Sequence, residues 1–465
     1  MVLEKGVVSK MPGKRDTEIK VLNEYLKRES SQLLILYGEK GVGKTTLLQE
    51  FIKEQKNVIF FDCSPVSERE QLYLWGKKMT SALGTMPEYP EFSDVFRALG
   101  NHIAADGKRI LIFDEFQNIA KVSEEFADYL FTHLQTSRKD VLIILCSSQV
   151  EWIENSMIKR FGLRAKYISG FLKVKELPFA EFIREFPQFT LEECVEGYAV
   201  FGGFPAVWEL VDKSLSLEEN MIQRVCNPNT MLHHYGVLTV ESQLRETSVY
   251  NTILSALAHG KYKLNELHQH TGFSRAKISV YIKNLMELGI LEKDFSVDTE
   301  GRDNLQKGLY GINNNYVDFT YQFLFSNETE LRKLGSQNFY NQYIKPELKR
   351  FTQKTFAAVC REYIEIQNRK NALPFSIRNV GKWTGKAGNI DIVARNESGR
   401  TIAGLCNWEN PVMKYEDYEK LLLCAKQAKL KPDYIYLFSA GGFEEALEKT
   451  AKEREDVRLL TPDKM

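Results

Sequence analysis

The sequence predicts an α/β protein built on a parallel sheet, with smaller domains following it. Three short apolar segments predict the sheet: residues 33–36, 110–113 and 141–146. Each is rich in Leu or Ile, and each is soon followed by small or charged polar residues. Such runs are typical of strands buried on both faces, and the residues after them lie at the edge where a parallel sheet binds ligands.

Composition narrows the class of protein. The chain has 465 residues, too many for one ordinary core, and 43% of them are hydrophobic while 27% are charged, as in globular proteins. Its 62 basic and 62 acidic residues cancel, so a nucleic-acid-binding surface would have to be local. The seven cysteines include no C-x-x-C pair, which argues against a zinc site or a disulfide framework and favours buried free thiols.

The sequence predicts no membrane partner. The longest apolar runs, such as 141–146, are far shorter than the ~20 residues of a membrane-spanning helix, and residues 1–10 lack the apolar centre of a signal peptide. We therefore expect a cytoplasmic protein.

A phosphate-binding loop follows the first apolar segment. Residues 38–45 read G-x-x-x-x-G-K-T between a strand and a helix-forming segment, the order that such a loop requires. Its glycines let backbone N–H groups point at phosphate oxygens, Lys44 would reach the β- and γ-phosphates, and Thr45 would place its hydroxyl on Mg²⁺. The loop therefore predicts binding of ATP with Mg²⁺. The expected nucleotide-binding residues are Gly38, Glu39, Lys40, Gly41, Val42, Gly43, Lys44, Thr45 and Thr46.

Three elements frame this loop. An amphipathic helix that opens at residues 14–19 is expected to pack beside the nucleotide, and residues 57–63 read as a second buried strand. A long helical region is expected from about 68 to 105, which brings the chain to its second motif.

The second motif joins a strand to two carboxylates. Residues 110–113 are apolar, and Asp114 and Glu115 follow directly, which is the form of a Walker B strand in ATPases. Asp114 would hold the Mg²⁺ shell. Glu115 faces another side of the strand and would polarise the attacking water, so the motif predicts ATP hydrolysis as well as binding.

Two further groups are candidates for the hydrolysis site. The third apolar segment ends in Ser147 and Ser148; we favour Ser148 as the hydroxyl that contacts the γ-phosphate or the attacking water, and a serine capping the next helix is the alternative. In the basic segment 159–164, Arg164 or else Arg160 would supply positive charge to the transition state, within one chain or between two. A solvated basic turn is the alternative there.

These motifs, in this order, resemble the prokaryotic AAA-type ATPase family that is widespread in archaea and found in some bacteria. The resemblance rests on the phosphate-binding loop, the serine pair and four further segments: 14–19, 114–117, 162–164 and 198–205. It implies a nucleotide-binding domain similar to those of AAA+ and STAND ATPases. It also implies a small helical lid, which carries the Gly-Gly-x-Pro element at 202–205.

A winged helix-turn-helix is predicted next. Its elements are helices at 250–257, 263–270 and 275–288, with Ser274 capping the third, and strands at 290–293 and 309–312. The recognition-helix side is mostly basic, which suits DNA phosphates: Lys261, Lys263, Arg275, Lys277 and Lys283 stand against Glu266. Over 241–320, however, basic and acidic residues nearly balance, so a protein–protein or interdomain role is the alternative.

The remainder of the chain reads first as helix and then as a further α/β domain. Residues 316–325 carry aromatic side chains at helical spacing, which favours a buried face over a base-stacking platform. The α/β domain is expected to contain helices at 351–367, 415–428 and 444–454, a hairpin of strands 388–394 and 401–408, and strands at 434–439 and 457–460.

This last region resembles the restriction-endonuclease-like domain that accompanies the same ATPase family. The resemblance implies that Glu362 and Asp391 match the first two carboxylates of a Mg²⁺ site. Leu405 and Asn407 stand where the family has a Glu-x-Lys pair, and Glu409 is a poor geometric replacement. We therefore expect a degenerate nuclease fold that is kept for binding or sensing.

Together these predictions define four domains. They are a P-loop ATPase core at 1–180, a helical lid at 181–240, a winged helix-turn-helix at 241–325 and a restriction-endonuclease-like α/β domain at 326–465. The leading hypothesis is an ATPase that acts as a molecular switch, in which nucleotide state rearranges the lid, winged helix and C-terminal domain. The alternatives are an ATP-licensed DNA-binding regulator or Mg²⁺-dependent nuclease, and a scaffold. The expected partners are ATP, DNA through the winged helix, and another protein or a second copy of the chain.

Overall fold

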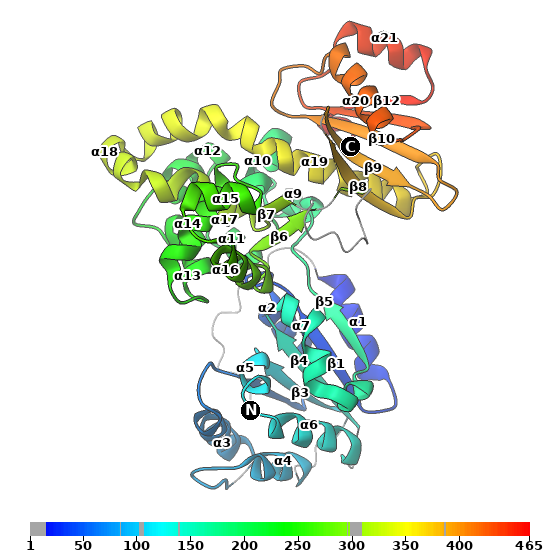
Figure 1. The fold of residues 1–465 in the computed structure, drawn as a ribbon. Helices are drawn as coiled ribbons and strands as arrows, with labels where there is room; N and C mark the ends of the chain where they lie inside the picture. The colour runs from blue at the N-terminus through cyan, green and yellow to red at the C-terminus, as the bar shows by residue number, and fades with distance from the viewer. Residues whose placement is uncertain are drawn as a thin grey trace. The chain divides into compact units, whose positions relative to one another are not determined.

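A computed structural model describes residues 15–83, 85–101, 107–137, 140–294, 296–297, 309–385 and 387–465 (Figure 1). The chain forms two compact units. The first contains the residues up to Glu176 together with Phe204–Ala206 and Asn284–Gly289, and the second contains Leu177–Gly203, Val207–Lys283 and Ile290–Met465. The four-domain division at 180, 240 and 325 stays a prediction.

The first unit is built on a five-stranded parallel sheet with the order β2-β3-β4-β1-β5. Its strands are β1 (Gln32–Tyr37), β2 (Val58–Asp62), β3 (Arg109–Asp114), β4 (Val141–Ser147) and β5 (Gly170–Lys173). The four strands predicted from apolar runs are confirmed. The edge strand β5 was not predicted, because only alternate residues of its four are sheltered and no apolar run marks it.

Helices cover this sheet. They are α1 (Asp16–Lys27), α2 (Lys44–Ile52), α3 (Glu68–Leu83), α4 (Phe92–Asn101), α5 (Gln117–Ala120), α6 (Glu125–Thr136), α7 (Val150–Asn155), α8 (Met157–Phe161) and the 3₁₀ turn η1 (Gly162–Tyr167). Helices α3 to α8 contribute to a core on one face of the sheet that includes Trp75, Phe113 and Phe126.

Two expectations about these helices need qualification. The single helical region expected at 68–105 is wrong, because α3 and α4 are separated by a segment that contains Pro87 and Pro90, and a proline disfavours helix at the residue before it. Residues 102–105 lie outside the described residues. So does Lys14, at the start of the expected first helix.

Short helices follow along the chain, and they belong to the second unit except where Phe204–Ala206 and Asn284–Gly289 group with the first. They are α9 (Phe179–Glu185), α10 (Leu191–Phe201), α11 (Pro205–Trp208), α12 (Leu217–Asn220), the π-helical turn η2 (Met221–Val225) and α13 (Met231–Glu241). The winged helix-turn-helix follows with α14 (Thr247–Ala258), α15 (Leu264–Thr271), α16 (Arg275–Glu287) and the antiparallel strands β6 (Leu291–Asp294) and β7 (Leu309–Ile312). The hydroxyl of Ser274 accepts the Lys277 N–H at 3.2 Å, which confirms Ser274 as the cap of α16.

A helical segment joins the winged helix to the C-terminal sheet. It consists of α17 (Asn315–Phe319), η3 (Thr320–Leu324), η4 (Phe325–Asn327), α18 (Glu328–Phe339), η5 (Tyr340–Ile344) and the long helix α19 (Lys345–Arg369). The aromatic side chains of Tyr316, Phe319, Tyr321 and Phe323 are all buried. The prediction that this stripe is packing is therefore confirmed.

The C-terminal part of the second unit is a mixed five-stranded sheet with the order β12-β11-β10-β9-β8. Its strands are β8 (Asn379–Gly385), β9 (Gly388–Arg395), β10 (Thr401–Asn407), β11 (Tyr434–Ser439) and β12 (Val457–Leu460), and its further helices are α20 (Tyr415–Gln427), α21 (Glu445–Glu453) and the 3₁₀ turn η6 (Pro462–Lys464). The predicted hairpin is confirmed, since β9 and β10 pair antiparallel. Strand β8 was not predicted.

Two smaller expectations concern the whole chain. All seven cysteines are free and buried, as their spacing predicts. Among the described residues, no helix combines the length and the apolar character that crossing a bilayer would require.

Candidate nucleotide-binding site

The loop after β1 begins at a glycine that has no room for a side chain. Gly38 donates its N–H to the Ser147 carbonyl at 3.2 Å, so it lies against the end of β4. A Cβ atom at this position would stand 2.1 Å from the carbonyl oxygen of Val174, just beyond β5. Val174 is itself bonded to the Tyr37 carbonyl at 2.7 Å. The backbone of Ser147 lies on one side of Gly38 and that of Val174 on the other, so only glycine fits at this position.

We expect Gly38→Ala to destabilise the first unit by about 1–3 kcal/mol, because the added methyl meets a backbone atom that cannot rotate away. Denaturant unfolding measures the change. Gly100→Ala is the matched control: Gly100 lies in α4 with nothing within 4 Å of an added Cβ, so alanine there should be neutral or slightly stabilising. Equal stability of the two variants would contradict this account of Gly38.

The end of the loop presents the start of a helix. Gly43 has a φ of +88°, which favours glycine, and directly precedes α2 without a side-chain cap. The first-turn N–H groups of α2 have no acceptor within the helix, and this is the usual binding site for phosphate. Pro205 lies 3.5 Å from the position of a Cβ at Gly43, and the Ala206 N–H donates to the Gly41 carbonyl at 3.4 Å. The Gly-Gly-x-Pro element thus ends against the loop.

The side chain of Lys44 is held inside the loop. It is only 5% exposed, and its ammonium group donates to the carbonyls of Gly38 at 2.8 Å and Glu39 at 2.9 Å. These bonds fix a positive charge where the backbone curls, as the P-loop motif predicts.

Arg15 supports the same loop from outside it. One guanidinium nitrogen donates to the carbonyl of Val42 at 2.8 Å and to that of Lys175 at 2.7 Å, and another pairs with Glu18 at 2.9 Å. The buried arginine therefore ties the loop to the chain beyond β5. Sequence reasoning placed Arg15 in the 14–19 segment but assigned it no role.

The hydroxyl of Thr45 and the carboxylate of Asp114 are brought together at the end of the sheet, with Oγ1 donating to Oδ2 at 3.0 Å. Burial raises the pKa of the Asp114 carboxyl, and the Thr45 hydroxyl and the Lys44 charge oppose that rise. A carboxylate and a hydroxyl are hard oxygen donors, the ligands that Mg²⁺ prefers. The two residues therefore fit the metal role predicted for them.

Glu115 has an unusual backbone and a well-defined carboxylate. Its φ of +53° is uncommon for a residue other than glycine, and such strain is found mostly at functional sites. Its Oε2 accepts the Ser148 hydroxyl at 2.6 Å, the Ser148 N–H at 3.3 Å and the amide of the buried Gln117. Ser148 thus contacts the carboxylate instead of capping α7, while the neighbouring Ser147 hydroxyl accepts the Gln149 N–H at 3.1 Å. Sequence reasoning assigned no role to Gln117.

The two candidate arginines are engaged elsewhere in the first unit. Arg164, in η1, forms an ion pair with Asp128 on α6, and its side chain is 44% exposed. Arg160 pairs with Glu124 at 3.0 Å. A role for either arginine in hydrolysis stays a prediction.

The carboxylates expected in the C-terminal domain bind to different parts of the backbone. Glu362 Oε2 accepts the Phe179 N–H at 3.2 Å, at the start of α9, and Asp391 Oδ2 accepts the Cys406 N–H at 2.9 Å, on β10. The neighbouring Arg361 donates to the Asp391 carbonyl at 2.9 Å. Burial raises the pKa of both carboxyls.

The positions that depart from the nuclease pattern are occupied structurally. The buried Asn407 amide donates to the Ser439 hydroxyl at 3.1 Å and to the Asn410 carbonyl at 3.0 Å. Within the described ranges, no group of three or more His, Cys, Asp or Glu side chains is placed to hold a metal ion.

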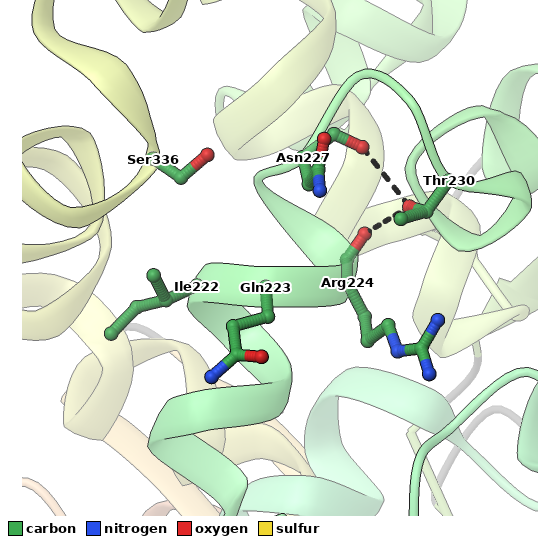
Figure 2. A pocket seen from close by; sticks show the side chains of 6 residues that line it. All are labelled: Ile222, Gln223, Arg224, Asn227, Thr230 and Ser336. Atoms are coloured by element: carbon green, nitrogen blue, oxygen red, sulfur yellow. Dashed lines mark hydrogen bonds between the residues drawn. The ribbon is translucent and has the colours of Figure 1, made fainter.

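A pocket of about 400 Å³ lies among the helices of the second unit, far along the chain from these motifs. Figure 2 shows its lining residues: Ile222, Gln223, Arg224, Asn227, Thr230 and Ser336. Its hydroxyls are already bonded to main chain, Thr230 to the Asn227 carbonyl at 3.0 Å and Ser336 to the Cys226 carbonyl at 2.9 Å. We assign it no ligand.

The parallel sheet, the glycine-rich loop and the Thr45–Asp114 pair define a P-loop ATPase-type domain. Residues 14–211 match the family model described as an ATPase domain predominantly from Archaea, so this part of the chain is an archaeal-type ATPase domain. Residues 251–293 match the model of the arsR family of bacterial regulatory proteins, which agrees with the winged helix-turn-helix. Residues 320–421 match a model of archaeal and bacterial proteins of unknown function.

Individual proteins are also similar to this chain. An uncharacterised protein of Methanocaldococcus jannaschii is 26% identical over 390 residues, which are 83% of this chain and 84% of that protein. A Walker-type ATPase of Pyrococcus abyssi has a similar structure, with a TM-score of 0.51 and 19% identity over 66% of this chain and 95% of its own. The Aeropyrum pernix ORC2 protein, in ADPNP and ADP complexes, matches with a TM-score of 0.43 and 17% identity over 69% of this chain and 96% of its own. Of these two structures, the Pyrococcus protein is the one whose similarity supports a shared fold.

Proposed function

We propose that this protein binds ATP with Mg²⁺ at the loop after β1, hydrolyses it, and uses the nucleotide state as a molecular switch. The observation that supports hydrolysis most directly is the geometry of Glu115. Its backbone has a strained positive φ, and its carboxylate accepts the Ser148 hydroxyl at 2.6 Å. A carboxylate fixed beside a phosphate-binding loop is suited to orient an attacking water and accept its proton.

The other residues have separate tasks in this proposal. The backbone N–H groups of 38–46 and the Lys44 ammonium bind the phosphates, and Arg15 keeps the loop in shape. Thr45 and Asp114 hold Mg²⁺, which supplies charge neutralisation for the phosphate oxygens. Arg164 remains a candidate for the transition-state cation.

We propose a switch because the loop contacts a short segment that is joined at both of its ends to residues of the second unit. Phe204–Ala206 groups with the first unit, whereas the residues on both sides of it belong to the second. A change in the loop that displaces Pro205 or Ala206 is therefore passed along the chain to Gly203 and Val207, which belong to the second unit.

Calorimetric titration with a non-hydrolysable ATP analogue, with and without Mg²⁺, tests the proposal at its base. We expect saturable binding that is stronger with Mg²⁺, and phosphate release when ATP replaces the analogue. A wild-type protein that binds no nucleotide would refute the proposal.

Binding of duplex DNA through α16 is a second candidate function. Arg275 and Lys277 are exposed at the N-terminal end of α16, the end that reads bases in helix-turn-helix proteins. Both side chains are oriented by neighbours: Arg275 Nε donates to Asn265 at 2.7 Å, and the Lys277 ammonium lies 4.7 Å from the centre of the Phe273 ring. Exposed side chains that neighbours already hold in place lose less entropy on binding phosphate.

We expect Arg275→Glu and Lys277→Glu each to weaken DNA binding and to lower the salt dependence of the affinity by about one unit of slope per lost phosphate contact. Fluorescence anisotropy at several salt concentrations measures both. Lys431→Glu, an equal charge change at an exposed site before β11, is the control. If the α16 variants bind like this control, α16 does not contact DNA and the protein-contact alternative gains support.

A further inference from the structure

Glu362 satisfies the start of a helix that has no cap of its own. Helix α9 begins at Phe179 after Pro178, and proline has no side-chain acceptor for the N–H groups of the first turn. The Glu362 carboxylate accepts one of them, the Phe179 N–H, at 3.2 Å. These partners are 183 positions apart in the sequence, so the contact joins distant parts of the second unit.

The residues just before α9 are also held. Leu177 is the first residue of the second unit, directly after the chain leaves the first. Its N–H donates to the Gly203 carbonyl at 2.7 Å, and its carbonyl accepts the Tyr198 hydroxyl at 2.8 Å. Tyr198 lies on α10, and its ring packs edge-on against that of Phe179 at 5.5 Å. Side chains of both α10 and α19 therefore contact the start of the second unit.

Helix α19 also contacts the C-terminal sheet, so it links that sheet to the start of the second unit. Towards α10, Lys349 pairs with Glu192 at 3.1 Å. Towards the sheet, the Gln353 amide donates to the Cys406 carbonyl at 2.8 Å and accepts the Trp408 N–H at 2.7 Å. Through α19, the C-terminal sheet is packed to the segment that follows the passage between units.

We propose that Glu362 is a positioning residue that latches the start of α9 to α19, and that through this latch the C-terminal domain sets the apparent affinity of the protein for ATP. The proposal rests on the proposed function, because its effect is on nucleotide binding. The start of α9 is linked to the loop through the bond from Leu177 to Gly203, which directly precedes the Phe204–Ala206 segment that contacts the loop. Releasing the latch lets this segment leave the loop, and apparent affinity falls in proportion to the fraction of molecules that remain competent to bind. The latch needs an acceptor oxygen, whereas a metal ligand would need the negative charge.

Hydrogen exchange tests the contact itself, without any nucleotide. We expect the amide of Phe179 to exchange roughly tenfold faster in Glu362→Ala than in wild type, because the carboxylate is its acceptor. Glu362→Gln keeps an acceptor oxygen and should retain the protection. Unchanged exchange in Glu362→Ala would overturn the latch.

Steady-state ATP hydrolysis tests the consequence. For Glu362→Ala we expect KM for ATP to rise about tenfold with kcat within about twofold of wild type, and for Glu362→Gln we expect both constants to stay near wild type. Glu365→Ala removes an exposed carboxylate from the same helix and is the matched control. Thermal melting shows whether each variant is folded.

The possible results distinguish between the latch, its effect on the affinity for ATP, and the proposed ATPase function. A KM in Glu362→Ala equal to that of the control overturns the regulatory proposal, and equal defects in the Ala and Gln variants show that the charge matters and overturn the latch. If wild-type protein binds no ATP, the proposed function fails while hydrogen exchange still reports on the contact.

Discussion

Replacing Lys44 by alanine is expected to abolish measurable ATP binding. The side chain is buried, and the carbonyls of Gly38 and Glu39 hold its ammonium group at 2.8 and 2.9 Å inside the loop that we propose binds the phosphates. Removing one partner of such a desolvated charge contact costs about 2–5 kcal/mol, which is roughly a 30-fold loss of affinity or more. Calorimetric titration with the non-hydrolysable analogue measures the loss.

A second lysine variant controls for charge and folding. Lys53 lies at the other end of α2, where its exposed ammonium pairs with Glu50. Lys53→Ala changes the net charge by the same amount and should bind the analogue like wild type. If Lys44→Ala is folded by thermal melting and still binds within a few-fold of wild type, the loop is not the nucleotide site.

Replacing Glu115 by glutamine is expected to stop hydrolysis while leaving binding intact. Glutamine is close in shape and keeps an acceptor for the Ser148 hydroxyl, but it cannot take a proton from water. We expect phosphate release in a single turnover to slow by about 100-fold or more, with the affinity for ATP within a few-fold of wild type. Rapid-quench measurement and calorimetry on the same preparation give the two numbers.

The comparison variant for this experiment is Glu125→Gln, at an exposed position in the first turn of α6. It should hydrolyse ATP like wild type. Hydrolysis in Glu115→Gln at the rate of Glu125→Gln would assign the water-orienting role to another residue. Loss of binding in Glu115→Gln would instead mean that Glu115 acts through the Mg²⁺ shell.

Much of the nucleotide site could be predicted because its signals are local in the sequence. The order of strand, glycine-rich loop and helix around Lys44, and the four apolar residues before Asp114, each lie within about ten residues. The rule that parallel strands gather their carboxyl ends at one edge then placed Ser148 in the ligand crevice. Its bond to the Glu115 carboxylate is a detail that only the structure shows.

Other parts of the site left no local signal. Arg15 supports the loop through the carbonyls of Val42 and Lys175, and any residue can offer a carbonyl, so no residue type marks these contacts. Strand β5 is short and only half sheltered, and its pairing with β1 depends on a neighbour more than 130 residues away in sequence.

By itself, the sequence determined the strands around the phosphate-binding loop, the winged helix-turn-helix and the C-terminal hairpin, because periodicity and turn chemistry specify elements one at a time. Only the tertiary structure decided where the side chains of those elements go. Glu362 shows the difference: the family resemblance matched it and Asp391 to two carboxylates of a degenerate Mg²⁺ site, whereas the fold directs its carboxylate to the uncapped start of α9. The physical reason is that a carboxylate binds the nearest unsatisfied donors, and packing determines which donors are near.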